Sequence, residues 1–292
     1  MGGRIWLRLP GTALAPLAAR NRARRRAPAP DSRAYDAAMV HAIDLNADVG
    51  EGLGPWPMGA DETLIPLVSS VNIACGSHAG DPVTIRRTVR LALEVGASLG
   101  AHPGYPDLVG FGRRELAMAP DELAASVLYQ VAAVAGIARA EGGVLRHVKP
   151  HGALYHRLAA DRAAAAAVVS AIVSLDAGLA VVGAPASALL AEATAAGLGA
   201  LAEGFADRAY EPDGRLRPRT LPGALLDDPA LAAAQAVSIA RDGRVTAVDG
   251  TRVAMSVQTL CVHGDTPGAP AIAAAVRAAL ADAEIDVRRS GA

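Results

Sequence analysis

From residue 42 onward, short apolar runs typical of β-strands alternate with longer runs typical of α-helices. This alternation indicates parallel βαβ units rather than a sandwich or a helix bundle. The predicted strands lie near residues 42–47, 71–74, 98–101, 145–149, 179–183, 200–204 and 258–262. The predicted helices lie near residues 61–69, 82–95, 121–141, 161–175, 186–196, 229–241 and 269–282. Seven such repeats fit either a closed TIM-type barrel or an open doubly wound sheet.

Polar side chains follow almost every predicted strand, and their positions discriminate between these two folds. A barrel brings all strand carboxyl ends around one mouth, whereas an open sheet spreads them along an edge. We therefore predict an α/β fold, an irregular TIM-type (β/α)7 barrel whose polar groups converge on one substrate. In chain order the groups are Asp44, Asn46, Asp48, Glu51, Asn72, His78, His102, Asp107, Lys149, His151, Glu203, Asp207, His263 and Asp265.

The first 38 residues differ in composition from the rest of the chain. They hold eight arginines, their prolines break any helix, and Met39 stands just before the first strand pattern. We predict a single catalytic barrel domain over residues 39–292, with residues 1–38 either disordered or an upstream extension from a misplaced start. An Arg-rich organelle-type presequence is the competing interpretation, because the unbroken apolar region of a signal peptide is absent.

Composition excludes several classes of partner. After residue 38 the chain holds 20 basic and 27 acidic residues, a net charge of about −7, so no basic patch for nucleic acid is expected. Two cysteines, Cys75 and Cys261, fit buried thiols in a reducing cytosol better than a disulfide framework. We expect no stretch long and apolar enough to span a membrane.

Lys149 is the only lysine among 28 Lys and Arg residues, and it stands at a predicted strand end between His147 and His151. Guanidinium is a planar fork that stays charged, whereas an ammonium is a compact point charge whose pKa moves readily on desolvation. We therefore predict that Lys149 takes part in chemistry or contacts the substrate. The alternative is that one lysine persists there without a role.

Residues 44–52 read Asp-Leu-Asn-Ala-Asp-Val-Gly-Glu-Gly, alternating polar and small apolar groups. A period of two points Asp44, Asn46 and Asp48 to the same side of the strand, where they are costly to bury without partners. The ladder supplies a general base or a metal carboxylate. The structural alternative is a hydrogen-bonded polar plug, which suits Asp44 better than Asp48 or Glu51 nearer the mouth.

His78 and His102 each lie in a glycine-flanked turn just after a strand. With Asp48 they would make a two-His, one-carboxylate metal site, although the spacing matches no dedicated zinc motif. A metal-free pair that serves as acid, base or hydrogen-bond donor is the alternative. Whether a metal is present stays open.

The segment 260–269 ends the last strand and starts the last helix, with Asp265 or Thr266 as the expected N-cap. Its backbone amides could hold a carboxylate or phosphate. A structural role in closing the barrel explains Asp265 and Thr266 well, and His263 less well. The chain contains neither a Walker sequence nor a dinucleotide fingerprint, so it shows no cofactor motif of its own.

Taken together and in order, six segments resemble the LamB/YcsF family. They are DLNADVGEG at 44–52, NIACGSHAGD at 72–81, GAHPGYPD at 100–107, VKPHGALYH at 148–156, EGFADRAY at 203–210 and LCVHGDTPGA at 260–269. The resemblance covers nearly all of the chain after Met39 and leaves residues 1–38 without a counterpart. It implies a barrel similar to the glycoside hydrolase/deacetylase superfamily.

The resemblance also implies ATP-dependent opening of the 5-oxo-L-proline lactam to L-glutamate, carried out in the cytoplasm by a three-part 5-oxoprolinase with partner subunits B and C. ATP would be a cosubstrate of the complex, and the partners would activate the lactam. Neither nucleic acid nor a membrane is an expected partner. An ATP-independent metal-dependent deacetylase or amidohydrolase, or a non-catalytic lactam-binding subunit, is the alternative function.

Opening a lactam requires an activated carbonyl, a water held by a base, and a proton for the departing nitrogen. We predict Asp48 or Glu51 as the base, and His78 and His102 as groups that position water or protonate nitrogen. Lys149 and His151 would neutralise phosphate or the developing oxyanion. The predicted substrate-binding residues are Asp44, Asn46, Asn72, Asp207 and His263.

Overall fold

The computed structural model describes residues 42–266 and 268–290, so the prediction for residues 1–38 lies outside the described residues. Seven parallel strands close into a barrel in the order β1-β2-β3-β4-β5-β6-β9, because β9 also pairs with β1. The strands are β1 (Ala42–Val49), β2 (Ser70–Ala74), β3 (Ser98–His102), β4 (Leu145–Val148), β5 (Ala180–Gly183), β6 (Gly199–Phe205) and β9 (Thr259–His263). The predicted (β/α)7 barrel is confirmed.

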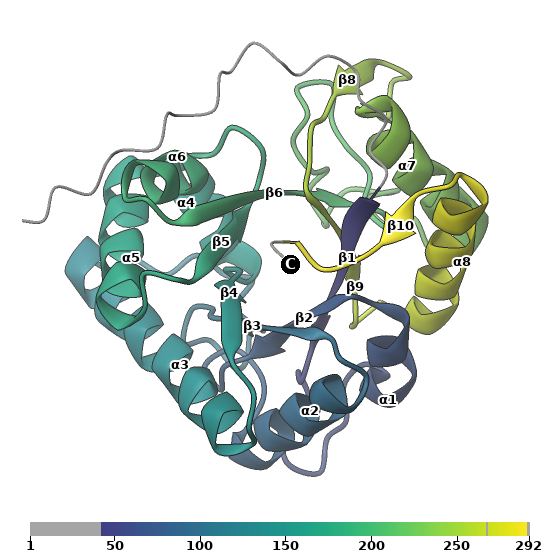
Figure 1. Ribbon diagram of the computed structural model, residues 1–292. Helices are drawn as coiled ribbons and strands as arrows, with labels where there is room; N and C mark the ends of the chain where they lie inside the picture. Colours follow the sequence, from purple (N-terminus) through teal and green to yellow (C-terminus); the bar gives the residue numbers. More distant parts are fainter. Residues whose placement is uncertain (1–41, 267, 291–292) are drawn as a thin grey trace, which may run out of the picture. The chain divides into compact units, whose positions relative to one another are not determined.

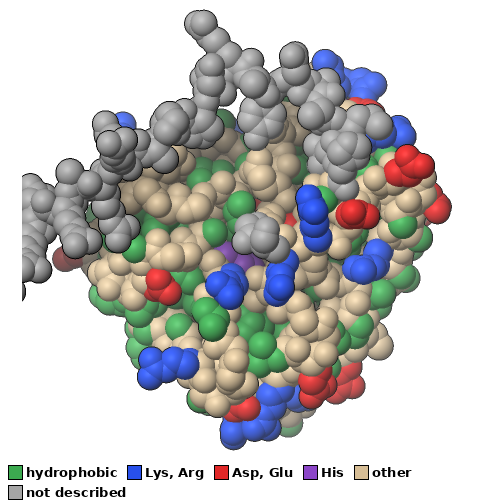
Figure 2. All heavy atoms as spheres, in the orientation of Figure 1, with side chains coloured by type: hydrophobic (Ala, Val, Ile, Leu, Met, Phe, Trp, Pro, Cys, Tyr) green, Lys and Arg blue, Asp and Glu red, His purple; other side chains and the backbone are tan. Residues whose placement is uncertain are grey.

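Helices surround this ring of strands (Figure 1). They are α1 (Asp61–Leu64) with a 3-10 helix (Ile65–Leu67), α2 (Pro82–Glu94), α3 (Pro120–Ala140), α4 (Gly152–Ala160), α5 (Arg162–Leu175), α6 (Ala188–Ala195), α7 (Pro229–Asp242) and α8 (Ala269–Asp282). Figure 2 shows one face of the molecule, with cationic and acidic side chains mixed around its periphery. This is the solvated outer surface expected of helices that bury only their inner face.

The barrel is irregular at two places. The pairing of β3 with β4 shifts register between Leu99 and Gly100. Between β6 and β9 the chain leaves the barrel to form an antiparallel ribbon of β7 (Arg244–Thr246) and β8 (Arg252–Ala254), as the turn at residues 249–250 predicts. A short strand, β10 (Asp286–Val287), pairs with the start of β1.

Side chains cap the starts of four of the eight α-helices among the described residues. Asp81 caps α2 by accepting from Val83 N and Thr84 N, and Asp228 caps α7 in the same way, each followed by proline. The predicted cap of α8 is wrong, since this helix begins after Gly268 without a side-chain cap. Asp265 instead pairs with arginine side chains, so its carboxylate is not available for capping.

Helix α4 was not predicted, because its residues were assigned only to the polar run that follows β4. It begins directly after His151, and Asp161 then ends it and caps α5 by accepting from Ala164 N. Leu154, Tyr155 and Leu158 are its buried residues. The helix therefore packs one face against the core and leaves the other face partly exposed.

Helix α3 corrects the expectation that no segment is long and apolar enough to cross a membrane. Its length and hydropathy satisfy that criterion. However, Leu123, Val127, Val131 and Val134 are buried in the core of the barrel. A long apolar helix that packs its inner face on a sheet needs no membrane to explain its composition.

Candidate active site

The predicted polar ladder on β1 faces the interior of the barrel. Asn46 donates to Thr259 Oγ1 (2.7 Å) on the neighbouring strand β9 and to Glu203 Oε1 (3.1 Å) on β6, and Asp48 contacts Lys149. Asp44, Asn46 and Asp48 are all buried. The period of two therefore places three polar groups in layers along the barrel axis.

Lys149 lies at the centre of the upper layer, the layer of polar side chains nearest the barrel mouth. Its Nζ donates to Asp48 Oδ1 (2.8 Å) and to Cys261 Sγ (3.0 Å), and it pairs with Glu203 Oε1 (2.8 Å). The side chain is 2% exposed. Burial opposes the ammonium charge, but Asp48 above all holds the pKa of Lys149 well above its usual value. The lone lysine is thus a buried cation clamped between two carboxylates.

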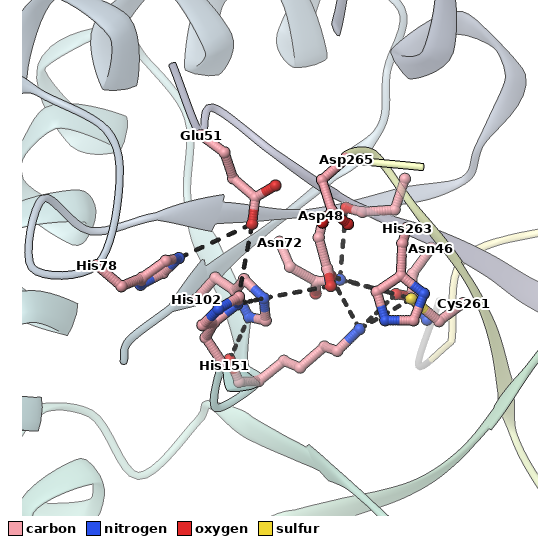
Figure 3. A network of polar contacts seen from close by, with 12 residues as sticks. Asn46, Asp48, Glu51, Asn72, His78, His102, His151, Cys261, His263 and Asp265 are labelled. Atoms are coloured by element: carbon pink, nitrogen blue, oxygen red, sulfur yellow. Dashed lines mark hydrogen bonds and ion pairs between the residues drawn. The ribbon is translucent and has the colours of Figure 1, made fainter. Parts of the chain in front are cut away.

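Asp48 is the ionised partner in this layer. Besides Lys149, its Oδ1 accepts from Asn72 Nδ2 (2.8 Å), and its Oδ2 lies 3.3 Å from His102 Nε2 (Figure 3). Burial opposes the negative charge, but His102 and Lys149 outweigh it and hold the pKa of Asp48 well below its usual range. A carboxylate with so low a pKa is a weak base and a strong electrostatic partner.

Two histidines continue this network toward the pocket. His102 Nδ1 lies 2.6 Å from the carbonyl oxygen of Lys149, and His151 Nε2 lies 2.8 Å from that of Phe111. Because carbonyls only accept, both of these nitrogens carry protons. The remaining nitrogens, His102 Nε2 and His151 Nδ1, face each other at 3.2 Å. A proton on His102 Nε2 can therefore be shared with either His151 or Asp48.

Glu51 and His78 form a second buried group beside His151. Glu51 Oε1 lies 3.8 Å from both His78 Nε2 and His151 Nδ1, and neither ring nitrogen of His78 has a hydrogen-bond partner among the described residues. Burial, and next the charge of Asp48, hold the pKa of Glu51 well above its usual value. Burial also holds the pKa of His78 well below its usual value.

The two histidine rings determine whether this second group fits a metal ion. The rings of His78 and His151 are stacked, with centroids 3.8 Å apart and an angle of 3° between their planes. An imidazole binds a metal through a lone pair in the plane of its ring, and no point lies in two parallel planes. Glu51, His78 and His151 in this arrangement do not fit a shared ion.

A second potential ligand group consists of Asp48, Cys261 and His263. Lys149 Nζ lies within 3.0 Å of both Asp48 and Cys261, so its ammonium already supplies the positive charge that an ion would bring. The predicted set of Asp48, His78 and His102 is not a ligand group among the described residues, because His78 is directed at Glu51 rather than at Asp48.

Asp207 and His263 form a further pair across the barrel from His102. Asp207 accepts from the backbone N of His263 (3.0 Å) and contacts its Nδ1 (2.9 Å), which fixes the ring. The ring also stacks on Phe205, with centroids 5.2 Å apart. Asp207 itself is fully buried and does not line the large pocket at the barrel mouth. It can therefore affect a ligand in that pocket only through His263, which does line it.

The lower layer of polar side chains is centred on Asp44, and its hydrogen-bond donors are hydroxyl groups instead of charged side chains. Asp44 accepts from Ser70 Oγ (2.7 Å to Oδ2), Ser69 Oγ (2.7 Å) and Thr259 Oγ1 (2.5 Å). It lines a cavity of about 30 Å³, separate from the large pocket. These are the contacts of the hydrogen-bonded plug that the sequence offered as an alternative. Asn46 and Asn72 bridge the two layers and do not reach the large pocket.

A pocket of about 1300 Å³ opens above the upper layer. The predicted site residues that line it are Asp48, His102, Lys149, His151 and His263. Those that do not line it are Asp44, Glu51, Asn46, Asn72, His78 and Asp207.

Other residues of the pocket were not predicted as site residues. Tyr155 has a buried hydroxyl without a hydrogen-bond partner among the described residues, and Phe205 lies with its ring 5.3 Å from Lys149 Nζ. Glu203 forms an ion pair with Lys149 beneath the pocket, and the sequence predicts it only as one of the polar groups that follow a strand. All three belong to the quoted segments 148–156 and 203–210, and these segments were the available signal.

Known proteins resemble the chain over nearly all of the described barrel. The LamB/YcsF family model matches residues 43–292. The A subunit of the 5-oxoprolinase from Methylococcus capsulatus is 55% identical, covering 87% of this chain and 97% of that protein. The corresponding protein from Chloroflexus aggregans is 56% identical, covering 85% and 98%. The crystal structure of the lactam utilization protein from Thermus thermophilus superposes with a TM-score of 0.80 at 48% identity, covering 85% and 99%.

Proposed function

This chain belongs to the LamB/YcsF family, and we propose that it is the ring-opening subunit of an ATP-dependent 5-oxoprolinase. The reaction is hydrolysis of 5-oxo-L-proline to L-glutamate. Two partner subunits, B and C, activate the lactam with ATP, and this chain completes the hydrolysis. The names of its relatives support the family role. The absence of a nucleotide-binding motif from this sequence agrees with activation by the partners.

One observation carries the proposal: the buried Lys149 ammonium bridges Asp48 and Glu203 beside a large pocket, with His102 next to the same carboxylate. Three charged side chains are costly to bury together, and the cost is offset only when each is paired. Perturbed groups that converge on a pocket are the usual mark of a catalytic site. The arrangement supports hydrolysis of a polarised carbonyl.

The geometry suggests a role for His102 as the proton carrier. Its Nδ1 is held by the Lys149 carbonyl, so Nε2 is the nitrogen that exchanges a proton with water or substrate. A proton taken from water onto Nε2 lies against the Asp48 carboxylate, which stabilises the imidazolium. The hydroxyl adds to the activated carbonyl carbon, and the same proton passes to the departing lactam nitrogen as the C–N bond breaks. With the carbonyl oxygen phosphorylated by the partners, this cleavage leaves an acyl phosphate, from which a second water releases inorganic phosphate and glutamate.

Lys149 and Asp48 support this transfer by electrostatics. The ammonium keeps Asp48 ionised beside His102, and its field stabilises negative charge that develops at the carbonyl oxygen above it. His151 lines the pocket and offers Nδ1 as an alternative acceptor for the proton of His102. Glu51 and His78 lie behind His151 and act through it, which replaces the expectation that they contact substrate directly.

Glutamate release from 5-oxo-L-proline and ATP tests the proposal. The full chain is assayed alone and then mixed with candidate subunits B and C. We expect glutamate only in the mixture, with loss of turnover in a His102→Asn variant. A verified complex that releases no glutamate would overturn the proposal. Normal turnover with variants of both His102 and Lys149 would reduce this chain to a lactam-binding subunit.

We propose that the complex works in the cytoplasm. Cys75 and Cys261 are both free and buried, and burial raises the pKa of each thiol. Unoxidised thiols agree with a reducing compartment. Fractionation of native cells, with detection of the chain in the membrane or periplasmic fraction, would contradict this placement.

A further inference from the structure

Arg208 is a buried cation without an acidic partner. The residue is 4% exposed, yet it lines the large pocket. Its Nε donates to the carbonyl of Ala224 (3.2 Å) and its Nη2 to that of Arg217 (2.7 Å). Within residues 42–266 and 268–290, no carboxylate lies within ion-pair distance of this guanidinium. Carbonyls satisfy two of its nitrogens but do not neutralise its charge, and a buried unpaired charge is costly.

Two further arginines, Arg113 and Arg219, line the same pocket and share one carboxylate. Arg113 Nη2 pairs with Asp265 Oδ2, and Arg219 Nη2 lies 3.9 Å from Asp265 Oδ1. Counting Arg208, the wall holds three guanidinium groups, and Asp265 is the one carboxylate that pairs with any of them among the described residues. This part of the pocket wall therefore carries a local excess of positive charge, although the chain as a whole is close to neutral.

The other acidic groups near this wall are already engaged. Asp207 is directed to His263, and Asp161 pairs with Arg157 (3.3 Å). Burial, and next the charge of Arg219, lower the pKa of Arg208 to about 10. Burial followed by Arg208 and Arg219 also lowers the pKa of His156, which lines the pocket beside them. The mutual repulsion agrees with a wall that carries more cations than carboxylates.

The backbone holds Arg208 in a fixed position. An isolated bridge pairs Arg208 with Leu225, and Ala209 N donates to the carbonyl of Ala224 (3.0 Å). The two side-chain hydrogen bonds then fix the plane of the guanidinium, leaving Nη1 without a hydrogen-bond partner among the described residues. A pre-oriented guanidinium loses little entropy on binding, and its fork matches the oxygens of carboxylate or phosphate.

We propose that Arg208, assisted by Arg219 and Arg113, forms a subsite for an oxyanion group of the ligand, in the same pocket as Asp48 and Lys149. The proposal deepens the proposed function and rests on it for the identity of the ligand. A carboxylate of the lactam and a phosphoryl group delivered by the partners share this chemistry. Anchoring one of them at the wall would leave the rest of the ligand free to approach His102 and Lys149.

Isothermal titration calorimetry on the full chain, without ATP or partners, tests the subsite. The probes are 5-oxo-L-proline, 2-pyrrolidinone, which has the lactam but no carboxylate, and inorganic phosphate. If the subsite takes the carboxylate, 5-oxo-L-proline binds at least about tenfold more tightly than 2-pyrrolidinone, and Arg208→Met removes that difference. If it takes the phosphoryl group, the same variant weakens phosphate by about tenfold and leaves 5-oxo-L-proline unchanged.

Arg217→Met is the matched control. Arg217 belongs to the same pocket wall, but its guanidinium already pairs with Glu211 (2.8 Å), so it offers a ligand less unpaired positive charge than Arg208 does. We expect this variant to bind every probe as the wild type does, and Arg208→Lys to recover part of the lost affinity. Arg219→Met is a second, more exposed variant with an expected loss of about threefold to tenfold, and it serves if Arg208→Met fails to fold.

Three results would overturn the subsite. They are wild-type binding of both oxyanions by a folded Arg208→Met, equal losses in Arg208→Met and Arg217→Met, and no binding of either oxyanion by the wild type. The outcome is separable from that of the proposed function. Arg208-dependent binding by a chain whose verified complex releases no glutamate would keep the subsite and remove the ring-opening assignment.

Discussion

The two layers of polar side chains inside the barrel each contain a buried aspartate of β1, but the pKa values of these two aspartates shift in opposite directions. Asp44 and Asp48 lie four residues apart on one strand, and both are buried. Hydroxyl groups surround Asp44, and burial raises its pKa. Asp48 faces Lys149 and His102, and its pKa is well below the usual range. Burial alone therefore does not make a reactive carboxylate, because the partner decides whether the charge persists.

Removing Lys149 should have the largest effect of the changes considered, because Lys149 is a cation that Asp48 contacts and Asp44 does not. We expect Lys149→Met to lower turnover of the reconstituted complex by about 10³-fold, since the charge that stabilises the transition state is lost. Folding should also weaken by about 3–5 kcal/mol, because Asp48 and Glu203 lose their shared cation. Glutamate release and urea denaturation measure the two effects. Arg146→Met, an exposed change on β4, the strand that directly precedes Lys149, is the control and should alter neither.

His102→Asn should give the next largest effect. The amide of asparagine can keep the contact with the Lys149 carbonyl, but the variant loses the ring nitrogen Nε2 that lies beside Asp48. Loss of one general acid–base group lowers turnover by about 10²-fold to 10⁴-fold. Glutamate release by the reconstituted complex measures the loss. Turnover within about twofold of the wild type would show that His102 carries no proton in the reaction.

His147 lies between the two layers and predicts how stability depends on pH. Burial is the main cause that lowers its pKa to about 4, and Nε2 lies 2.8 Å from Asn72 Oδ1. Because the folded pKa is depressed, this contribution to stability is complete above about pH 6.5 and is lost as the pH falls toward 4. The loss is about 3 kcal/mol for a group that stays neutral across that window.

The measurement is the free energy of unfolding in urea between pH 7 and pH 4, for the wild type and for His147→Gln. Other buried histidines and carboxyls titrate in the same range, so the difference between the two proteins is the informative quantity. We expect the advantage of the wild type to shrink by about 3 kcal/mol across the window. A constant difference would mean that His147 does not titrate there.

Ser70→Ala in the lower layer should have the smallest effect. It removes a hydroxyl that donates to Asp44 Oδ2 (2.7 Å), so folding should weaken by about 1–3 kcal/mol. Turnover should stay within about twofold of the wild type, because the large pocket and its charged pair are untouched. A tenfold fall in turnover without loss of folding would extend the functional site down to Asp44.

The sequence predicted the barrel well because strand and helix periods are local properties. All seven barrel strands were located, and the alternation on β1 correctly placed Asp44, Asn46 and Asp48 inside the barrel. Helix α4 was missed because a polar motif obscured its short apolar face. The α8 cap was predicted incorrectly because Arg113 and Arg219, distant in sequence, compete for Asp265.

The site was predictable where a residue was unusual by itself. Lys149 was conspicuous as the only lysine. Arg208 was not, since arginine is common in this chain and the surrounding loop has no periodicity to indicate which side chains are buried. The separation of Glu51 and His78 from the pocket also depends on packing, because His151 lies between them and the ligand region. Such placements arise from tertiary contacts that local patterns do not encode.

Barrel closure between the first and last strands has a consequence for the newly synthesised chain. Asp48 is paired in register with His263, and Cys261 completes the surroundings of Lys149. A chain still emerging from the ribosome therefore holds Asp48 and Lys149 before the strand that shields them exists. Pairing of such distant segments comes late in folding. The reactive layer is thus assembled only after β9 has been synthesised, so a chain terminated before β9 cannot form it.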